Sequence, residues 1–304
     1  MTTTARPATA ARADVALIAV ALTTVSTSGP LMAAIAAPAL AVAFWRNAMA
    51  SAVLVPTALL RRREELRGLT ARERRTAVVA GAFLALHFGT WVPSLSYTSV
   101  ASATALVATQ PIWAALIARS RGQHVGGQVW TGIAVAMAGA LLLTGSDLSV
   151  SGEALLGDVL AVAGGAFAAL YMAAGGEVRQ SVSTTTYTTL CYATTALLLL
   201  VVCLVGGVDL SGYDGDDWLR LLALTAGAQL LGHSLFNVVL RTVSPTVLSL
   251  TLLLEIPGAG LIAWVALDQT PSLLALPAAV LLLAGLALVI RASSRATPPS
   301  VPVE

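Results

Sequence analysis

Long apolar stretches alternate with short polar segments along most of this chain. Each stretch is close to the 20 or so residues that a helix needs to cross the hydrocarbon core of a bilayer. They predict ten membrane-spanning helices, at about 15–35, 38–60, 76–96, 99–118, 127–145, 154–175, 186–206, 217–239, 246–267 and 273–291. The first two spans are the hardest to separate, because Gly29, Pro30 and Pro38 interrupt a single apolar run.

Composition agrees with this pattern. Hydrophobic residues make up 57% of the chain, the mean hydropathy is +0.84, and only 11% of residues are charged, against about 25% in soluble domains. The longest polar segments, 61–75 and 207–217, are too short to form a soluble core. We therefore expect an all-α integral membrane protein.

The basic residues predict the orientation of the spans. All 17 are arginines. If the N-terminus is cytoplasmic and the spans alternate, every arginine except Arg46 and Arg220 falls on the cytoplasmic side, whereas most acidic residues of the loops fall on the other side. Basic residues are retained on the cytoplasmic side. We expect a multi-pass protein of the cell (inner or plasma) membrane, with cytoplasmic tails at 1–13 and 292–304.

The two halves of the chain repeat each other at an offset of 146 residues. The offset places His87 on His233, Pro111 on Pro257, Gln123 on Gln269 and Gly139 on Gly285. An odd number of spans per half inserts the halves in opposite orientations, and inverted repeats are typical of secondary transporters. We expect two five-helix repeats, at 14–145 and 154–291.

Several short motifs carry a family resemblance that extends over about residues 14–291. They are His87-Phe88-Gly89-Thr90-Trp91, Tyr97-Thr98-Ser99-Val100-Ala101-Ser102, Gln110-Pro111-Ile112-Trp113, Trp130-Thr131-Gly132-Ile133-Ala134, Ala138-Gly139, Arg46 and Glu255-Ile256-Pro257. The chain resembles the EamA-type branch of the drug/metabolite transporter superfamily. The resemblance implies ten helices in two inverted five-helix repeats around a central cavity. It also implies transport of amino acids, other small metabolites, nucleotide sugars or other solutes.

The chain departs from the family pattern in two places. Gln123 and Gln269 stand where an acidic residue often follows spans 4 and 9, although Asp268 adjoins the second. The Trp-Gly pair often found in span 1 is replaced by the segment 26–30. The first departure weakens the case for an acidic structural cap, and the second leaves the substrate class open, because span 1 is expected to line the cavity.

Glu255 is the strongest candidate for a role in transport. A charged side chain at the centre of a span costs about 2.5–3.5 kcal/mol on insertion scales, so it should face a cavity or a partner. Glu255 lies near the middle of span 9, two residues before Pro257, whose ring leaves a backbone carbonyl without its usual donor. It can bind a proton or a cationic group. Alternatively it forms an interhelical ion pair with Arg46, or bonds a carbonyl in its protonated form.

His87 and His233 occupy equivalent positions of spans 3 and 8. Imidazole changes its charge between pH 5 and 8, so the pair is a candidate proton relay. The alternative is that both pack structurally, and their repeat equivalence fits either case.

Arg46 and Gln110 complete the polar candidates. Arg46 either binds a substrate carboxylate, or it neutralises Glu255 or caps backbone carbonyls. Gln110 precedes Pro111 in span 4, as Ile256 precedes Pro257 in span 9, and paired breaks at repeat-related positions are expected to line a transporter cavity. The alternative for both prolines is a plain packing kink.

Two tryptophans are candidates for an apolar cavity wall. Trp91 ends span 3 and Trp113 lies within span 4. Tryptophan is also common at the membrane interface, which is the alternative for both.

These features together predict a secondary transporter, an exporter of a small amino acid-like or drug-like metabolite, that works by alternating access of the two repeats. No GxxxxGK[ST] phosphate-binding loop occurs, so the energy source is a proton gradient, or transport is passive or by exchange. We expect no cofactor, no metal and no nucleic acid, and a monomer or homodimer in the lipid bilayer. The alternative functions are an intramembrane enzyme and a structural or sensory membrane protein.

Overall fold

The computed structural model describes residues 8–98, 103, 106–144, 152–258 and 274–295. Those residues contain helices and turns but no β-strand. The helices are α1 (Ala8–Ser26), α2 (Ser28–Ala33), α3 (Ala39–Arg61), α4 (Arg63–Gly68), α5 (Ala71–Ser94), α7 (Gln110–Ser120), α8 (Gly127–Thr144), α9 (Gly152–Val178), α10 (Thr184–Val205), α11 (Gly215–Leu224), the π-helical segment η1 (Thr225–His233), α12 (Ser234–Val239), α13 (Pro245–Leu252) and α15 (Ala275–Arg295). Predictions for residues 99–102, Thr104, Asp147, Asp268, Gln269 and the chain ends lie outside the described residues.

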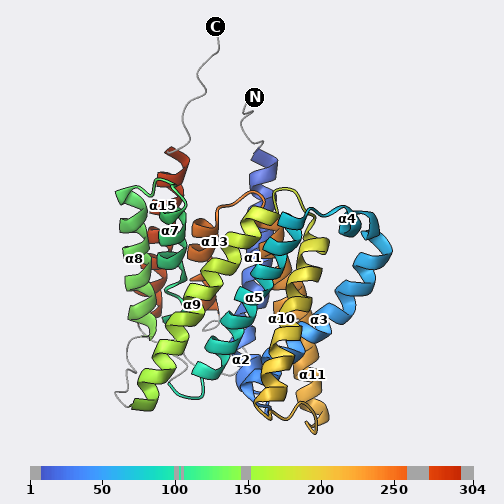
Figure 1. Ribbon diagram of the computed structural model, residues 1–304. Helices are drawn as coiled ribbons and strands as arrows, with labels where there is room; N and C mark the ends of the chain where they lie inside the picture. Colours follow the sequence, from blue (N-terminus) through green and yellow to red (C-terminus); the bar gives the residue numbers. More distant parts are fainter. Residues whose placement is uncertain (1–7, 99–102, 104–105, 145–151, 259–273, 296–304) are drawn as a thin grey trace.

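Each of the ten expected spans contains described helix, although the fourth and ninth are described only in part, and successive spans run in opposite directions (Figure 1). Five described helices are long and apolar enough to cross a membrane, and shorter apolar helices occupy 127–142, 245–258 and 276–292. Span 1 is divided into α1 and α2 at Thr27, close to the expected interruption at Gly29. Span 8 is a continuous helix built from α11, η1 and α12, with its central part wound as a π-helix.

The interface between α8 and α15 shows how the two repeats are related. A Cβ atom added to Gly132 would lie 2.8 Å from the carbonyl oxygen of Gly285, and one added to Gly139 would lie 2.8 Å from that of Ala278. The 146-residue offset carries Gly132 onto Ala278 and Gly139 onto Gly285. The two contacts therefore exchange their partners between repeats, as a two-fold axis requires.

The other helix pairs follow the same symmetry. Helix α5 packs on α9, and its counterpart η1 packs on α1, the counterpart of α9. Helix α3 packs on its own counterpart, α10. The chain is thus a multi-pass membrane protein of two inverted repeats.

The outward faces of the helices are apolar. On α10, Leu197, Val201 and Leu204 are 61%, 50% and 66% exposed, and their spacing places them on one side of the helix. A face of this kind would be a liability in water, but it matches the hydrocarbon of a bilayer.

The two ends of the bundle differ in charge. One end, which we call the arginine-rich end, carries both ends of the described chain, α4 and the segment 61–75 (Figure 1). The other end, the acidic end, carries the connection from α10 to α11 with Asp209 and Asp214, and the first turn of α11 with Asp216. This separation agrees with the distribution expected from the sequence.

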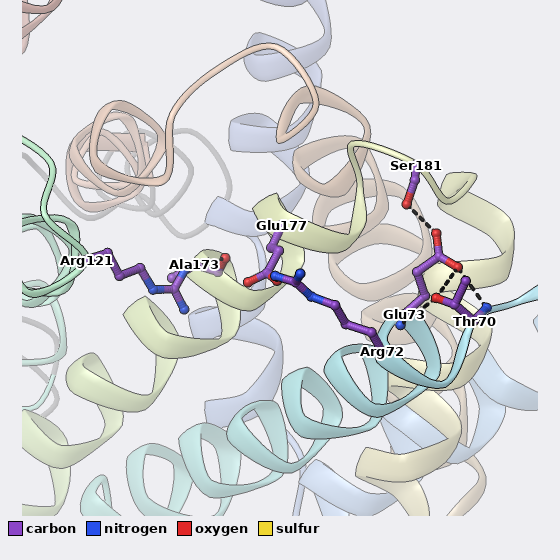
Figure 2. A network of polar contacts seen from close by, with 7 residues as sticks. All are labelled: Thr70, Arg72, Glu73, Arg121, Ala173, Glu177 and Ser181. Atoms are coloured by element: carbon purple, nitrogen blue, oxygen red, sulfur yellow. Dashed lines mark hydrogen bonds and ion pairs between the residues drawn. The ribbon is translucent and has the colours of Figure 1, made fainter.

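At the arginine-rich end, polar contacts tie α5 of the first repeat to α9 and the α9–α10 connection of the second (Figure 2). Arg72 pairs with Glu177 at 2.7 Å. Glu73 accepts a hydrogen bond from Ser181 while closing the capping box of α5 with Thr70. Exposed pairs such as Arg72–Glu177 contribute at most about 1 kcal/mol, so this network positions the loops more than it stabilises the fold.

Glu65 makes a second link between the repeats. Its carboxylate accepts hydrogen bonds from the backbone N–H of Ser183 at 2.6 Å, from the Ser183 hydroxyl at 2.7 Å and from Thr186 Oγ1 at 2.9 Å. Partial burial disfavours ionisation of Glu65, but these hydrogen bonds outweigh it and hold the pKa of the carboxyl below its usual value. The charged form of Glu65 therefore holds the start of α10.

Candidate functional site

A cavity of about 90 Å³ lies among the helices at the centre of the bundle. A space of this size holds several water molecules. It is lined by side chains of both repeats and brings together six of the residues singled out from the sequence: Arg46, His87, Trp91, Gln110, His233 and Glu255. Trp113 does not line it; its indole N–H donates to Thr109 Oγ1 at 3.2 Å.

Each repeat has a helix break beside this cavity, at closely related positions. The helix is interrupted at 108–109, just before Gln110 and Pro111, and at 253–254, shortly before Pro257. Proline has no N–H and crowds the preceding turn, so neither segment continues as a regular helix through these positions. Val107, Ala108, Leu253 and Glu255 border the cavity beside the two breaks.

Arg46 on α3 is wholly buried in the cavity wall. Its Nε donates to Gln229 Oε1 at 2.9 Å, its Nη1 lies 4.0 Å from Met32 Sδ, and its Cζ lies 4.4 Å from the centroid of the Phe88 ring. These partners are an amide, a thioether and an aromatic face, and none carries a full negative charge. The remaining nitrogen, Nη2, has no hydrogen-bond partner among the described residues.

Gln229 holds Arg46 in place, and sequence reasoning missed it. The Gln229 amide accepts from Arg46 and donates through Nε2 to Asn47 Oδ1 at 3.0 Å, while Asn47 donates to Ala43 O at 2.9 Å. Both amides are fully buried. A signal was present, because Gln229 is an uncharged polar residue in the middle of an apolar span, as Gln110 is.

Glu255 borders the same cavity from the opposite repeat. It follows the break in span 9, and its backbone carbonyl accepts a hydrogen bond from Ser26 Oγ at 3.4 Å. The described contacts include no ion pair between Glu255 and Arg46. The sequence left open an interhelical ion pair between these two residues, and that pair is not formed in this conformation.

His87 and Trp91 form a stacked pair on α5. The imidazole Nδ1 lies 3.0 Å from the carbonyl oxygen of Gly164 on α9, and the two rings stack at 14° with centroids 5.5 Å apart. A carbonyl only accepts, so Nδ1 carries the hydrogen and the neutral ring keeps its lone pair on Nε2. A Cβ on Gly164 would lie 2.9 Å from Trp91 Cβ, so this close approach requires glycine. The buried Trp91 N–H has no partner among the described residues.

His233 differs from His87 despite their repeat equivalence. It ends η1 and meets the Phe88 ring edge-on, with centroids 5.8 Å apart. The counterpart of η1 in the first repeat is regular α-helix within α5. A π-helical segment shifts the register of the residues around it, and such segments are frequent at functional sites. The two histidines thus reach one cavity in different settings.

Three side chains that line the cavity, one from the first repeat and two from the second, lie in contact with one another. Gln110 Nε2 lies 3.1 Å from Met172 Sδ and 3.1 Å from Ser249 Oγ. A further polar group, Tyr171–Asn237–Tyr192, lies beside the cavity: Asn237 exchanges hydrogen bonds with the Tyr171 hydroxyl and donates to Tyr192. Asn237, like Gln229, is an uncharged polar residue of span 8 that sequence reasoning missed.

The site therefore combines apolar walls with a few convergent polar groups, as small-molecule sites do. Arg46 and Trp91 each have an N–H donor with no partner in the part of the chain that the structure describes, and Glu255 lines the same cavity. Among the described residues, no group of three or more His, Cys, Asp or Glu side chains could hold a metal ion. These residues can bind a small molecule with charged ends through hydrogen bonds and ion pairs.

Comparisons with known proteins are consistent with this arrangement. The model of the EamA-like transporter family matches residues 13–145 and, a second time, residues 155–291. Comparison with curated proteins gives no match. A solved structure titled only as the crystal structure of a protein is similar over 94% of this chain and 99% of its own, with 19% sequence identity and a TM-score of 0.78. At that identity the likeness concerns the fold alone.

Proposed function

The chain belongs to the EamA-like transporter family, and from this premise we propose that it exports a small organic metabolite by alternating access of its two repeats. The central cavity is the substrate site, and relative movement of the repeats opens it to one side of the membrane and then to the other. The arginine-rich end faces the cytoplasm, because basic residues stay on that side. Both termini are then cytoplasmic, and the membrane is the cell's inner or plasma membrane.

The substrate carries a carboxylate, and the observation that supports this is the state of Arg46. A guanidinium that is fully buried without an anionic partner is costly, and Nη2 keeps an unused donor at the cavity. A substrate carboxylate would supply both the missing charge and the missing acceptor. Glu255 in the same cavity suits an ammonium group. An amino acid-like zwitterion satisfies both residues better than an uncharged drug-like molecule does.

Coupling to protons runs through Glu255 in this proposal. A carboxyl that is protonated in one half of the cycle and ionised in the other carries one proton per turnover. His87 and His233 border the same space and form the alternative route. Exchange without protons is the competing mode, and it leaves Glu255 as a binding group only.

Counterflow in proteoliposomes tests the proposal. Vesicles containing the purified protein are loaded with an unlabelled amino acid, and uptake of the labelled form is followed at several pH values. We expect uptake by the wild type, and a changed pH dependence in Glu255→Gln but not in Glu64→Gln, which alters an exposed carboxyl outside the cavity. Full uptake by Glu255→Gln at every pH would remove the proton-carrier role.

The same assay separates transport from the other functions considered. An intramembrane enzyme or a sensory component would produce no flux of unmodified solute. Absence of counterflow for every carboxylate-bearing solute, from protein that remains folded, would refute the proposed function.

A further inference from the structure

A second space opens toward the arginine-rich end, beyond the central cavity. It is a cleft of about 430 Å³ between α7, α9 and the connection from α12 to α13. Its walls are more polar than those of the cavity and include Arg121, Glu177 and Arg241. The cleft and the cavity share three helices, so what separates them can be identified residue by residue.

The separation consists of Gln110, Met172 and Ser249, which we call the barrier residues. All three line the central cavity. The cleft is lined instead by their neighbours on the side of the arginine-rich end: Ala114 one turn after Gln110, Ala173 directly after Met172, and Pro245 one turn before Ser249. Helices α7 and α9 run toward this end and α13 runs away from it (Figure 1). The barrier residues therefore lie between the two spaces.

The contact among the barrier residues joins the two repeats. Gln110 belongs to the first repeat, and its amide lies 3.1 Å from both Met172 Sδ and Ser249 Oγ of the second. Ser249 Oγ also lies 3.6 Å from Met172 Sδ. A thioether is a weak acceptor and the methionine side chain is flexible. Such a contact fills the gap yet separates at low cost when the repeats move.

The repeat-related positions cannot make the same contact. The 146-residue offset relates Gln110 to Ile256, Met172 to Ser26 and Ser249 to Ala103. Ile256 and Ala103 have no polar side-chain group, and Ser26 donates instead to the backbone carbonyl of Glu255. The contact among three side chains is therefore specific to the set nearer the arginine-rich end.

A second contact crosses the same region closer to the surface. Arg121, which follows α7, donates through Nη1 to the carbonyl oxygen of Ala173 on α9 at 3.3 Å (Figure 2). Ala173 is the residue next to Met172, so this bond holds α9 to the end of α7 just above the barrier. Arg121 is exposed, and the bond is long, so it adds little to the closing free energy.

We infer that the cleft is the entrance to the central cavity and that Gln110, Met172 and Ser249 form the gate between them, closed in this conformation. The inference rests on the proposed transport function and adds the entry route and its gating residues. Met172 is the plug, because its side chain is the acceptor that Gln110 and Ser249 share.

Thiol labelling on either side of Met172 tests the gate. Ala168 on α9 lines the cavity and Ala173 lines the cleft, and they are 5% and 7% exposed, so Ala168→Cys and Ala173→Cys form a matched pair. A membrane-impermeant charged thiol reagent is added to vesicles with the arginine-rich end outward. The native Cys191 and Cys203 are buried, and the unsubstituted protein gives their background.

We expect Ala173→Cys to react rapidly and Ala168→Cys slowly. Adding Met172→Ala should raise the Ala168→Cys rate about threefold, the shift in open population that the loss of one weak hydrogen bond produces, and leave the Ala173→Cys rate unchanged. Leu252 on α13 also lines the cavity, so Leu252→Cys is a second reporter. Cysteine is smaller than leucine, so this substitution does not overpack the site.

Two results would overturn the gate. One is that Ala168→Cys and Ala173→Cys react at equal rates while Met172 is intact. The other is that Met172→Ala accelerates the labelling of neither Ala168→Cys nor Leu252→Cys. The measurement needs no substrate. The gate can therefore fail while counterflow succeeds, and counterflow can fail while the labelling pattern holds.

Discussion

Two repeat-equivalent glycines should respond in opposite ways to the same substitution. Gly81 on α5 and Gly227 in η1 are related by the 146-residue offset. A Cβ on Gly81 would lie 2.5 Å from the carbonyl oxygen of Cys191 and 2.7 Å from Thr194 Cβ. A Cβ on Gly227 would meet nothing within 4 Å. The pair thus compares one sequence position in two packing environments.

The expected magnitudes follow from these distances. Ordinary contact begins at 3.4 Å, so Gly81→Ala must displace the α10 backbone by about 0.9 Å (3.4 − 2.5). Overpacking of this kind costs about 1–3 kcal/mol, and the better helix propensity of alanine returns up to about 1 kcal/mol. Because the obstructing atom of Gly81→Ala is backbone, we take the upper part of the overpacking range, about 2–3 kcal/mol; less about 1 kcal/mol of helix propensity, the variant should lose about 1–2 kcal/mol. Gly227→Ala should gain about 0–1 kcal/mol.

The assay is thermal unfolding of the two purified variants in the same detergent, followed by loss of the monodisperse peak. Gly81→Ala should unfold several degrees below the wild type, and Gly227→Ala at or slightly above it. Equal shifts for the two variants would refute the reasoning, because they would mean that the repeats pack alike at this position.

Three further predictions concern the site and the arginine-rich end. Gln229→Leu removes the acceptor of Arg46 Nε and the donor to Asn47. It should lower the free energy of unfolding by about 2–4 kcal/mol and weaken substrate binding, both measured by thermal unfolding with and without ligand. An unchanged melting temperature would contradict this. Trp91→Phe removes an N–H that has no partner among the described residues, so stability should hold while the counterflow half-saturation concentration rises, and an unchanged half-saturation would show that the N–H does not meet substrate. The folded-state pKa of Glu65 is lowered, so its stabilising effect is present above the usual value of 4.5 and is lost as the pH falls through the folded pKa. Glu65→Gln should therefore flatten the acid side of a profile of melting temperature against pH. An identical profile would count against the hydrogen bonds to Ser183.

The architecture was predictable from the sequence because its signals are long-range and redundant. A span of about 20 apolar residues has one physical meaning, and the arginine distribution orders the spans independently. The repeat was visible because a histidine match is rare in a chain with three histidines. The π-helical winding of η1 could not be predicted in this way. The same residue, glycine, stands at position 227 in η1 and at the repeat-related position 81 in the regular helix α5, so this position does not indicate the difference.

The site was predictable in its ionisable members but not in their partners. Arg46, His87 and Glu255 stood out because charge is costly in hydrocarbon. Gln229 and Asn237 carry weaker signals, and only the geometry shows that one holds Arg46 and the other joins two tyrosines. Trp91 and Trp113 carried the same prediction, because the sequence does not show which side of a helix faces the cavity, and only Trp91 lines it.

The central claim is that Arg46 binds the carboxylate of the substrate in the central cavity. It is tested by counterflow of an amino acid against its amide, which lacks the negative charge, in the wild type, in Arg46→Gln, and in Arg220→Gln as a control. Arg220 is an arginine at the acidic end that pairs with Asp217 outside the cavity.

The account predicts that the wild type and Arg220→Gln prefer the acid over the amide. The expected ratio is about tenfold or more, the worth of one charge-assisted hydrogen bond. Arg46→Gln, verified as folded by its elution and melting, should lose that preference. A folded Arg46→Gln that still prefers the acid by the wild-type ratio would contradict the claim.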